Sequence, residues 1–207
     1  MPDSPPVCAV VLAAGRAERF GGGKLGVALA GAETVLARTV RGALDPSVGA
    51  AGVWLAARRA EAAPWLGPLA QRVHWVEVEA GGGQGDSLAA AARALPPGAR
   101  ILVVLGDMPL SVPGAAARTV AALAHAPAGT RAAACVRDGV RMPPAVFAAP
   151  MRPGIEALGG DRGARALLGG AGVAEVDPGG GPWHLDLDRP GDLGALRQAA
   201  EEERGWR

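Results

Sequence analysis

The stretch VCAVVLAAGRAERFGGGKLG, from Val7 to Gly26, decides the fold class. Its first part, Val7 to Ala14, is apolar, rich in valine and uncharged, which predicts a short strand buried on both faces of a parallel sheet. A glycine ends that strand, and Gly21 to Gly23 follow between the cations Arg19 and Lys24. A glycine backbone can approach a ligand closely while its N–H groups and both charges face an anion. The stretch therefore predicts a phosphate-binding loop directly after a buried strand.

Two known phosphate signatures do not fit this loop. A Walker A loop requires a glycine where Glu18 stands and a serine or threonine where Leu25 stands, so it is excluded. Gly21, Gly23 and Gly26 satisfy G-x-G-x-x-G, but the first of them lies well beyond the strand end and no helical pattern opens after the third. We interpret that match as chance in a glycine-rich chain.

The composition favours one globular domain over residues 1–207. The chain has 49% hydrophobic residues and a mean hydropathy of +0.18, enough to bury a sizeable core. Lysine and arginine number 21 against 20 aspartates and glutamates, without a long block of like charge. A nucleic-acid partner or an anionic membrane therefore has no electrostatic support, and a small ligand is expected.

The two cysteines and the first residues indicate the compartment. Cys8 and Cys135 lie in separate apolar runs outside any C-x-x-C pair, which predicts buried free thiols in a reducing environment. No apolar run approaches the ~18 residues of a membrane span, and MPDSPP is neither basic nor apolar enough for a signal peptide. We expect a cytoplasmic protein.

Strand-like and helical patterns alternate along the chain, which is typical of an α/β fold with a wound, mostly parallel sheet between two layers of helices. The helix after the second strand is expected to be interrupted at Pro64. The predicted strands are Gly52–Ala57, Val73–Val78, Ile101–Leu105 and Arg131–Val136, and the predicted helices are Thr34–Leu44, Arg58–Leu69, Ser87–Leu95 and Pro113–His125.

Asp107 is the strongest single candidate for a site residue. It follows the secure strand Ile101–Leu105 and the small residue Gly106, which leaves room for a phosphate. Ligands of wound sheets bind at the carboxyl ends of central strands. A carboxylate facing a triphosphate requires a divalent cation between them, so Asp107 implies Mg²⁺. The alternative is a turn aspartate before Pro109.

A second glycine loop, Gly81 to Ser87, leads into the helix Ser87–Leu95. Asp86 or Ser87 can cap this helix, and its first N–H groups together with Ser87 can contact a ribose, a base edge or a phosphate. The alternative is a capped helix without a ligand.

Two charged stretches in the last quarter of the chain are further candidates for ligand-binding residues. Asp161 is a possible N-cap of a short helix, and Arg162 and Arg165 can hold a phosphate, although a solvated arginine face is equally compatible. Leu185–Asp188 alternates apolar and acidic residues and predicts a strand with its two carboxylates on one face, followed by a helix from Pro190, so that capping alone can account for Asp188. His74, His125 and His184 show no metal spacing, which gives zinc no support.

Five motifs in order resemble one family. LAAG at Leu12–Gly15, Arg19-Phe20-Gly21 and Lys24-Leu25 resemble the L-A-A-G-x-x-x-R-[MF]-G-x-x-K-L opening of the nucleotidyltransferases of the molybdenum cofactor guanylyl/cytidylyltransferase group, the MobA/MocA-like NTP transferases. The later stretches GQGDSLAAAARAL, VLGDMPL, GDRGARALL and LDLDRPGDL match in the same order and extend the resemblance over nearly the whole chain.

The resemblance implies a three-layer, Rossmann-like nucleotide-diphospho-sugar transferase fold and transfer of a nucleoside monophosphate from an NTP to a phosphate acceptor of the molybdopterin type, with release of pyrophosphate. It implies Mg²⁺ on Asp107 and Asp186, Arg19 and Lys24 on the triphosphate, and a molybdoenzyme or its chaperone as a protein partner. The nucleotide-binding residues it implies are Leu12, Ala13, Ala14, Gly15, Arg19, Lys24, Gly85, Ser87, Gly106 and Asp107, and the acceptor-binding residues are Asp161, Arg162 and Arg165.

The chain is closer to the cytidylyl type because Ala14 stands where guanylyl-type relatives tend to have glycine, which predicts CTP over GTP. It departs from the family at Met142-Pro143-Pro144, where a Gly-His-Pro run is usual, and at Gly23, where an aspartate is frequent. Two alternatives stay open: a sugar- or polyol-phosphate nucleotidyltransferase, and a nucleotide-binding module without catalysis.

Overall fold

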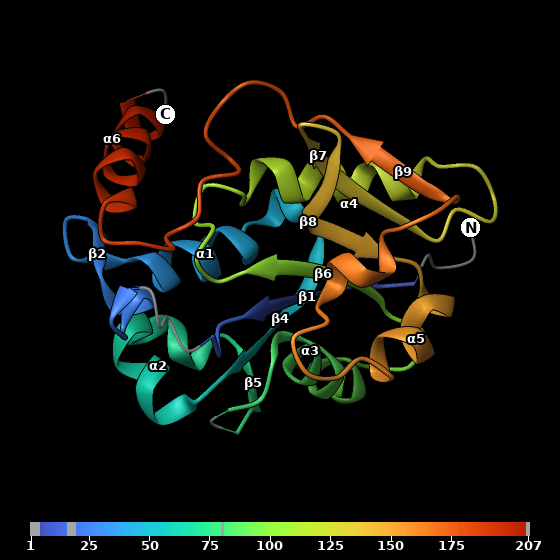
Figure 1. Cartoon of the computed structure of the whole chain (residues 1–207), viewed down its shortest axis with the longest axis horizontal. Helices are drawn as coiled ribbons and strands as arrows, with labels where there is room; N and C mark the ends of the chain where they lie inside the picture. The colour runs from blue at the N-terminus through green and yellow to red at the C-terminus, as the bar shows by residue number, and fades with distance from the viewer. Residues whose placement is uncertain (1–4, 16–19, 80, 206–207) are drawn as a thin grey trace.

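The computed structural model describes residues 5–15, 20–79 and 81–205, the last three by their backbone alone. Within these residues the fold is α/β, with a seven-stranded central sheet between two layers of helices (Figure 1). The strands follow the order β5-β4-β1-β6-β8-β7-β9, and β8 alone runs antiparallel to its neighbours. The sheet is therefore mostly parallel, as the alternation of apolar runs and helical patterns predicts.

The strands and helices have the following bounds. The central sheet consists of β1 Val7–Leu12, β4 Ala50–Ala57, β5 His74–Glu77, β6 Arg100–Leu105, β7 Ala132–Arg137, β8 Val140–Phe147 and β9 Val173–Val176. The strands β2 Ala28–Ala30 and β3 Glu33–Thr34 form a separate hairpin. The helices are α1 Val35–Ala43, α2 Arg59–Leu66, α3 Gln84–Ala94, α4 Gly114–Ala124, α5 Arg152–Glu156 and α6 Asp192–Gly205.

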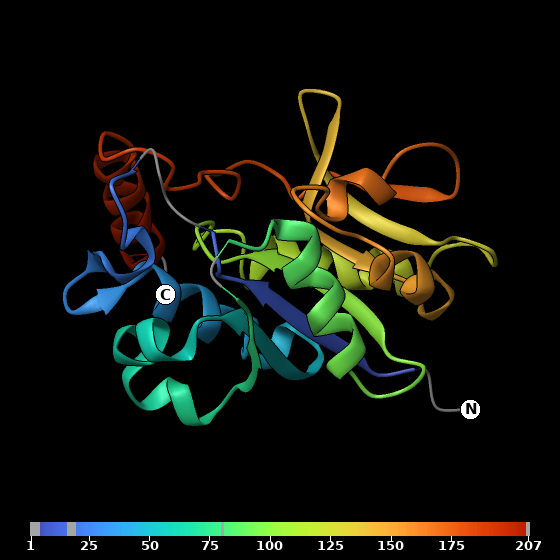
Figure 2. The ribbon, with the colours of Figure 1, turned by 60° about the horizontal axis from the view of Figure 1, so that its bottom comes forward.

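The strand β1 lies between two hydrophobic cores, one on each face of the sheet. Its residues Val7, Ala9 and Val11 pack with the apolar faces of α1, α2, α4 and α6, whereas Cys8 and Val10 pack with α3 and α5 on the other face. Figure 2 shows α3 lying along β1, apart from the helices that cover the opposite face. Since every residue of β1 is buried, the run needs no polar alternation, which is why it is apolar throughout. Cys8 and Cys135 are buried free thiols, as expected.

Two predicted helices differ from the observed ones at their ends. Helix α3 begins at Gln84, three residues before the predicted start, because the Asp86 carboxylate accepts a hydrogen bond from the Gly83 N–H at 2.9 Å and closes the first turn. Helix α2 continues through Pro64 and ends at Leu66, because Gly67, the residue after it, has a φ of 55° that is incompatible with a right-handed helix. The expected interruption at Pro64 is therefore wrong, since a glycine and not the proline breaks the helix.

The predicted strand Leu185–Asp188 is wrong. The strand β6 already pairs with β1 on one edge and with β8 on the other. The segment Leu185–Asp188 therefore has no unpaired edge of β6 with which to form a strand. It forms a loop in which Leu187 is buried and donates a single backbone hydrogen bond to the Asp107 carbonyl at 3.0 Å. The last helix begins at Asp192, whose carboxylate accepts hydrogen bonds from the N–H groups of Asp188 and Arg189 in the turn before the helix.

The strand β8 contains Met142-Pro143-Pro144, which sequence patterning did not assign to a strand. Its register with β7 shifts between Ala134 and Cys135, and the two prolines lie buried next to this irregularity. Prolines are tolerated in a strand where the ladder is interrupted. None of the helices in the described part of the chain is long and apolar enough to cross a membrane.

Candidate active site

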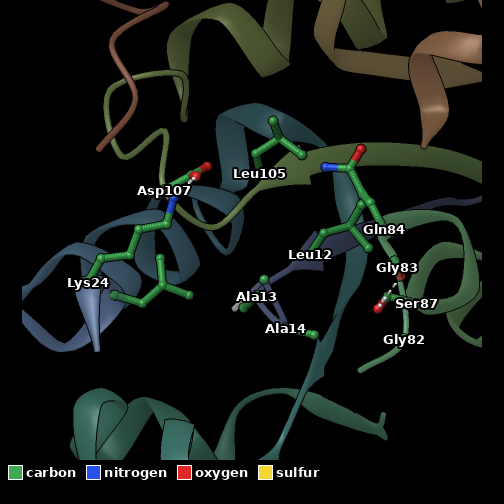
Figure 3. Close-up of a pocket in the computed structure, with 12 residues that line it drawn as sticks. Leu12, Ala13, Ala14, Lys24, Gly82, Gly83, Gln84, Ser87, Leu105 and Asp107 are labelled. Atoms are coloured by element: carbon green, nitrogen blue, oxygen red, sulfur yellow. Dashed lines mark hydrogen bonds and ion pairs between the residues drawn. The ribbon is translucent and has the colours of Figure 1, made fainter. Parts of the chain in front are cut away.

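The carboxyl ends of β1 and β6 form the point where the strand order reverses. From β1 the chain moves to β4 and β5 on one side, and then returns to β6 on the other side of β1. Wound sheets bind ligands in the crevice outside such a switch point. A pocket occupies this place (Figure 3), and it is lined by Leu12, Ala13, Ala14, Gly15, Lys24, Leu25, Gly82, Gly83, Gln84, Ser87, Leu105 and Asp107.

Gly106 brings the two strand ends together. Its N–H donates to the Leu12 carbonyl at 2.9 Å, and a Cβ at this position would lie 3.0 Å from the same oxygen and 3.2 Å from the Cβ of Ala13. The space beside Gly106 is filled by the chain that follows β1. The glycine therefore allows close approach of two strands, which corrects the expectation that it makes room for a phosphate.

Lys24 and Asp107 form an ion pair across the floor of the pocket. The Lys24 Nζ donates to Asp107 Oδ2 at 2.7 Å, and the two side chains are only 11% and 22% exposed. Figure 3 shows them pointing toward each other from the glycine loop and from the end of β6. Lys24 begins a short 3-10 turn whose preceding residue, Gly23, has a left-handed φ of 62°. A glycine is favoured there, so the loop conformation that holds the amine depends on it.

Two further carboxylates surround this pair. The Oδ1 of Asp188 lies 4.0 Å from the Lys24 amine. The pKa of Asp186 is raised, first by partial burial of its carboxylate and then by the negative charge of Asp107, with Asp188 acting in the same direction and Lys24 opposing it. The residues expected to bind metal are thus within electrostatic reach of each other, and their mutual repulsion is a feature that a cation would relieve.

The donor set fits a hard divalent cation that also takes oxygens from a ligand. Asp107 and Asp186 offer carboxylate oxygens, and Mg²⁺ is typically held by one or two carboxylates together with phosphate oxygens and water. Among the described residues, no group of three or more His, Cys, Asp or Glu side chains is arranged to hold a metal by itself. A cation at this site would therefore depend on a phosphate ligand for part of its coordination.

The N-terminal turn of α3 forms the opposite wall. Gly82, Gly83, Gln84 and Ser87 line the pocket, and the Ser87 hydroxyl donates to the Gly83 carbonyl at 3.2 Å. Gly85 faces away, since a Cβ there would lie 2.6 Å from the Arg162 carbonyl. Ser87 lines the pocket, as predicted from the sequence, whereas Gly85 does not. Gln84 was not selected as a site residue, because the predicted helix begins three residues after it.

The predicted acceptor residues do not form one cluster. Asp161 and Arg162 lie in an exposed loop against the start of α3, where the Gly160 carbonyl accepts from the Gly85 N–H at 2.8 Å. Arg165 lines a different hollow together with Arg141 and Glu175. Asp161 is not the expected N-cap either, because Gly163 precedes the 3-10 turn Ala164–Leu167 and no side chain caps it. Arg19, the other predicted catalytic cation, lies outside the described residues.

The sequence matches the model of a known protein family over the residues that form the pocket. The model of the MobA-like NTP transferase domain matches residues 9–176, which include most of β1, the glycine loop, α3 and the end of β6. The chain belongs to this family. No curated protein matches the chain at a significant level.

Solved structures of other MobA-like and nucleotidyltransferase proteins have the same fold. Rv0371c from Mycobacterium tuberculosis H37Rv is 28% identical, with a TM-score of 0.73 over 93% of this chain and 98% of its own, and a second structure of it is a complex with manganese. A nucleotidyl transferase from Methanothermobacter is 23% identical, with a TM-score of 0.74 over 97% and 99% of the two chains. Molybdopterin-guanine dinucleotide biosynthesis protein A from Archaeoglobus fulgidus is 17% identical, with a TM-score of 0.63 over 95% and 100%.

The match to the MobA-like domain ends before the loop that carries Asp186 and Asp188. This loop reaches the site through the hydrogen bond from Leu187 to the Asp107 carbonyl. The family assignment therefore covers the pocket and the Lys24–Asp107 pair, and the additional carboxylates rest on the geometry of this chain.

Proposed function

We propose that the protein transfers a nucleoside monophosphate from an NTP to a phosphate-bearing acceptor and releases pyrophosphate. CTP is the favoured donor, GTP is second, and the acceptor is molybdopterin or the molybdenum cofactor. The observation that carries the proposal is the Lys24–Asp107 pair at the carboxyl ends of β1 and β6, in a pocket whose other wall is the start of α3. The core that runs from Val7 to Ala200 supports one domain acting as a unit.

The residues of the pocket divide between the base and the phosphates. The apolar side chains of Leu12 and Leu105 and the backbone of Ala13 and Ala14 suit a base, while Ser87 suits its polar edge or the ribose. Lys24 and Arg19 bind the triphosphate. Asp107 and Asp186 hold Mg²⁺, which, when bound, neutralises the charge that develops on the phosphate oxygens.

No protein nucleophile is required for this reaction. The acceptor phosphate attacks the α-phosphorus in line with the departing pyrophosphate, so the protein acts by positioning and by fixed charge. The low exposure of Lys24 strengthens its interaction with the triphosphate, because a charge acts more strongly away from bulk water.

Ala14 supports CTP as the donor. It lines the pocket together with Gly82 and Gly83, and its methyl group narrows the space that a glycine would leave for a purine. One methyl group discriminates by about 1 to 3 kcal/mol, or roughly tenfold to two-hundredfold. A preference for GTP in direct competition would assign base choice to the α3 wall.

One observation favours testing a second class of acceptor. Where the family usually has a histidine, Pro143 is buried within β8 and has neither a side-chain donor nor a backbone N–H to offer an acceptor. A sugar or polyol phosphate would use the same nucleotide pocket and the same Lys24–Asp107 pair. The acceptor assay therefore includes both classes.

The test combines the purified protein with Mg²⁺, each NTP in turn, and either molybdopterin or a panel of sugar and polyol phosphates, and follows pyrophosphate release. We expect release with CTP and molybdopterin. Release only with a sugar or polyol phosphate would replace the acceptor, and binding of NTP in calorimetry without release in any mixture would identify a nucleotide-binding module.

A further inference from the structure

Lys24 is the only lysine of the 207 residues, and its amine does not point into open space. It lies 2.7 Å from Asp107 Oδ2 and 4.0 Å from Asp188 Oδ1, and its charge also reaches Asp186. In the structure the amine therefore faces the carboxylates, whereas the proposed reaction places it on the triphosphate.

This contact is held by the fold on both sides. The 3-10 turn Lys24–Gly26 packs against α2, because the indole of Trp65 covers Gly26 so closely that a Cβ there would lie 2.6 Å from Cε2. On the other side, the Leu187 N–H fixes the acidic loop to the Asp107 carbonyl at 3.0 Å. An ion pair between mostly buried side chains is screened less than a surface pair, so it competes effectively with another cation.

We propose that Lys24 is the internal counter-ion of Asp107, Asp186 and Asp188, so that a divalent cation enters with the NTP and not before it. The inference rests on the proposed function and describes how that site is regulated. The phosphates of an arriving NTP draw the amine away from Asp107, and the freed carboxylates then accept the cation. Because such coupling is reciprocal, NTP raises the affinity for the cation by the same factor as the cation raises the affinity for NTP.

The decisive measurement is binding of Mn²⁺ alone, followed by electron paramagnetic resonance without nucleotide. Lys24→Met keeps the length of the side chain and removes its charge. We expect it to bind Mn²⁺ at least tenfold more tightly than the wild type, while it binds CTP more weakly. The exposed Arg72→Met removes the same charge away from the site and is expected to leave Mn²⁺ affinity within twofold. Equal or weaker Mn²⁺ binding by Lys24→Met overturns the proposal.

A second measurement uses the wild type, so it does not depend on the folding of a variant. Acetylation of the single lysine by a water-soluble succinimidyl ester is followed by peptide mass spectrometry, which separates it from the terminal amine. We expect saturating Mn²⁺ to accelerate modification of Lys24, because its carboxylate partner is occupied, and added CTP to slow it. A rate that Mn²⁺ leaves unchanged overturns the proposal.

The two proposals fail in different ways. If Lys24→Met tightens Mn²⁺ binding but no NTP binds to the wild type, the counter-ion role stands and the nucleotidyltransferase function falls. If NTP binds and reacts but Lys24→Met does not tighten Mn²⁺ binding, the function stands and Lys24 acts on the triphosphate alone.

Discussion

Gly83→Ala tests whether the start of α3 is shaped by its contact with the distant loop at Gly160. Gly83 has φ −81° and ψ 178°, a conformation open to alanine, so backbone strain plays no part. A Cβ at this position would lie 2.6 Å from the Asp161 nitrogen and nearer still to the Gly160 carbonyl group. These are backbone atoms that cannot rotate away, so the two segments must separate by about 1.4 Å to reach an ordinary contact near 3.5 Å.

The expected cost follows from what this separation disrupts. Overpacking of a close contact costs about 1 to 3 kcal/mol. The shift also weakens the 2.8 Å hydrogen bond from the Gly85 N–H to the Gly160 carbonyl, and a hydrogen bond of this kind contributes about 0.5 to 1.5 kcal/mol. We therefore expect Gly83→Ala to lower the free energy of unfolding by about 1.5 to 4.5 kcal/mol.

Urea unfolding measures this change, and Gly82→Ala is the matched control. A Cβ on Gly82 would meet the Cβ of Asp86 at 3.6 Å and the Glu79 carbonyl at 3.7 Å, which are ordinary contacts. We expect the control to stay within about 0.5 kcal/mol of the wild type. Equal stability of the two variants would refute the close contact between Gly83 and the loop at Gly160.

Two further predictions concern charge and pH. Asp107→Asn keeps the shape of the side chain and removes its charge, so we expect Mg²⁺-dependent pyrophosphate release to fall by about a thousandfold with little change in the melting temperature; near-normal turnover would contradict the metal role. Burial raises the pKa of the Cys135 thiol to about 11. Between pH 9 and 11 the unfolded chain therefore releases this proton while the folded chain keeps it. As the pH rises through this window, the free energy of unfolding falls, by up to about 2.7 kcal/mol in total. The chain has no tyrosine to titrate in that window, and urea unfolding across it should give a shallower decline for Cys135→Ala, whereas an unchanged slope would assign the loss to other groups.

The sequence predicts the elements that depend on local pattern. The apolar run at β1 and the run Ile101–Leu105 within β6 are identified because burial on both faces removes polar residues over a short stretch. Asp107 is identified for the same reason, since it follows directly on such a run. The ion pair with Lys24 is not readable in this way, because the two residues are 83 positions apart and only the strand order brings them together.

The wall at α3 shows a different limit. The alanines of this helix indicate its middle, but its first turn also contacts residues far away in sequence. Gln84 packs its carboxamide onto Gly163, and the Gly160 carbonyl accepts from Gly85. Since a pattern within one segment carries no record of these two contacts, the predicted helix starts late. Gly82, Gly83 and Gln84 are placed in the predicted glycine loop but are not selected individually as pocket residues.

For the acidic loop Leu185–Asp188, the sequence predicts the side on which the carboxylates lie although it predicts the wrong secondary structure. Alternation of apolar and acidic residues over Leu185–Asp188 predicts a strand, yet the same alternation arises wherever one side of an extended chain packs against a core. Leu187 is buried and its neighbours reach solvent, so the pattern records burial of one face and not pairing in a sheet. Both arrangements direct Asp186 and Asp188 to one side. The carboxylates can thus be placed from sequence, whereas their distance from Lys24 depends on one backbone hydrogen bond to Asp107 that only the fold provides.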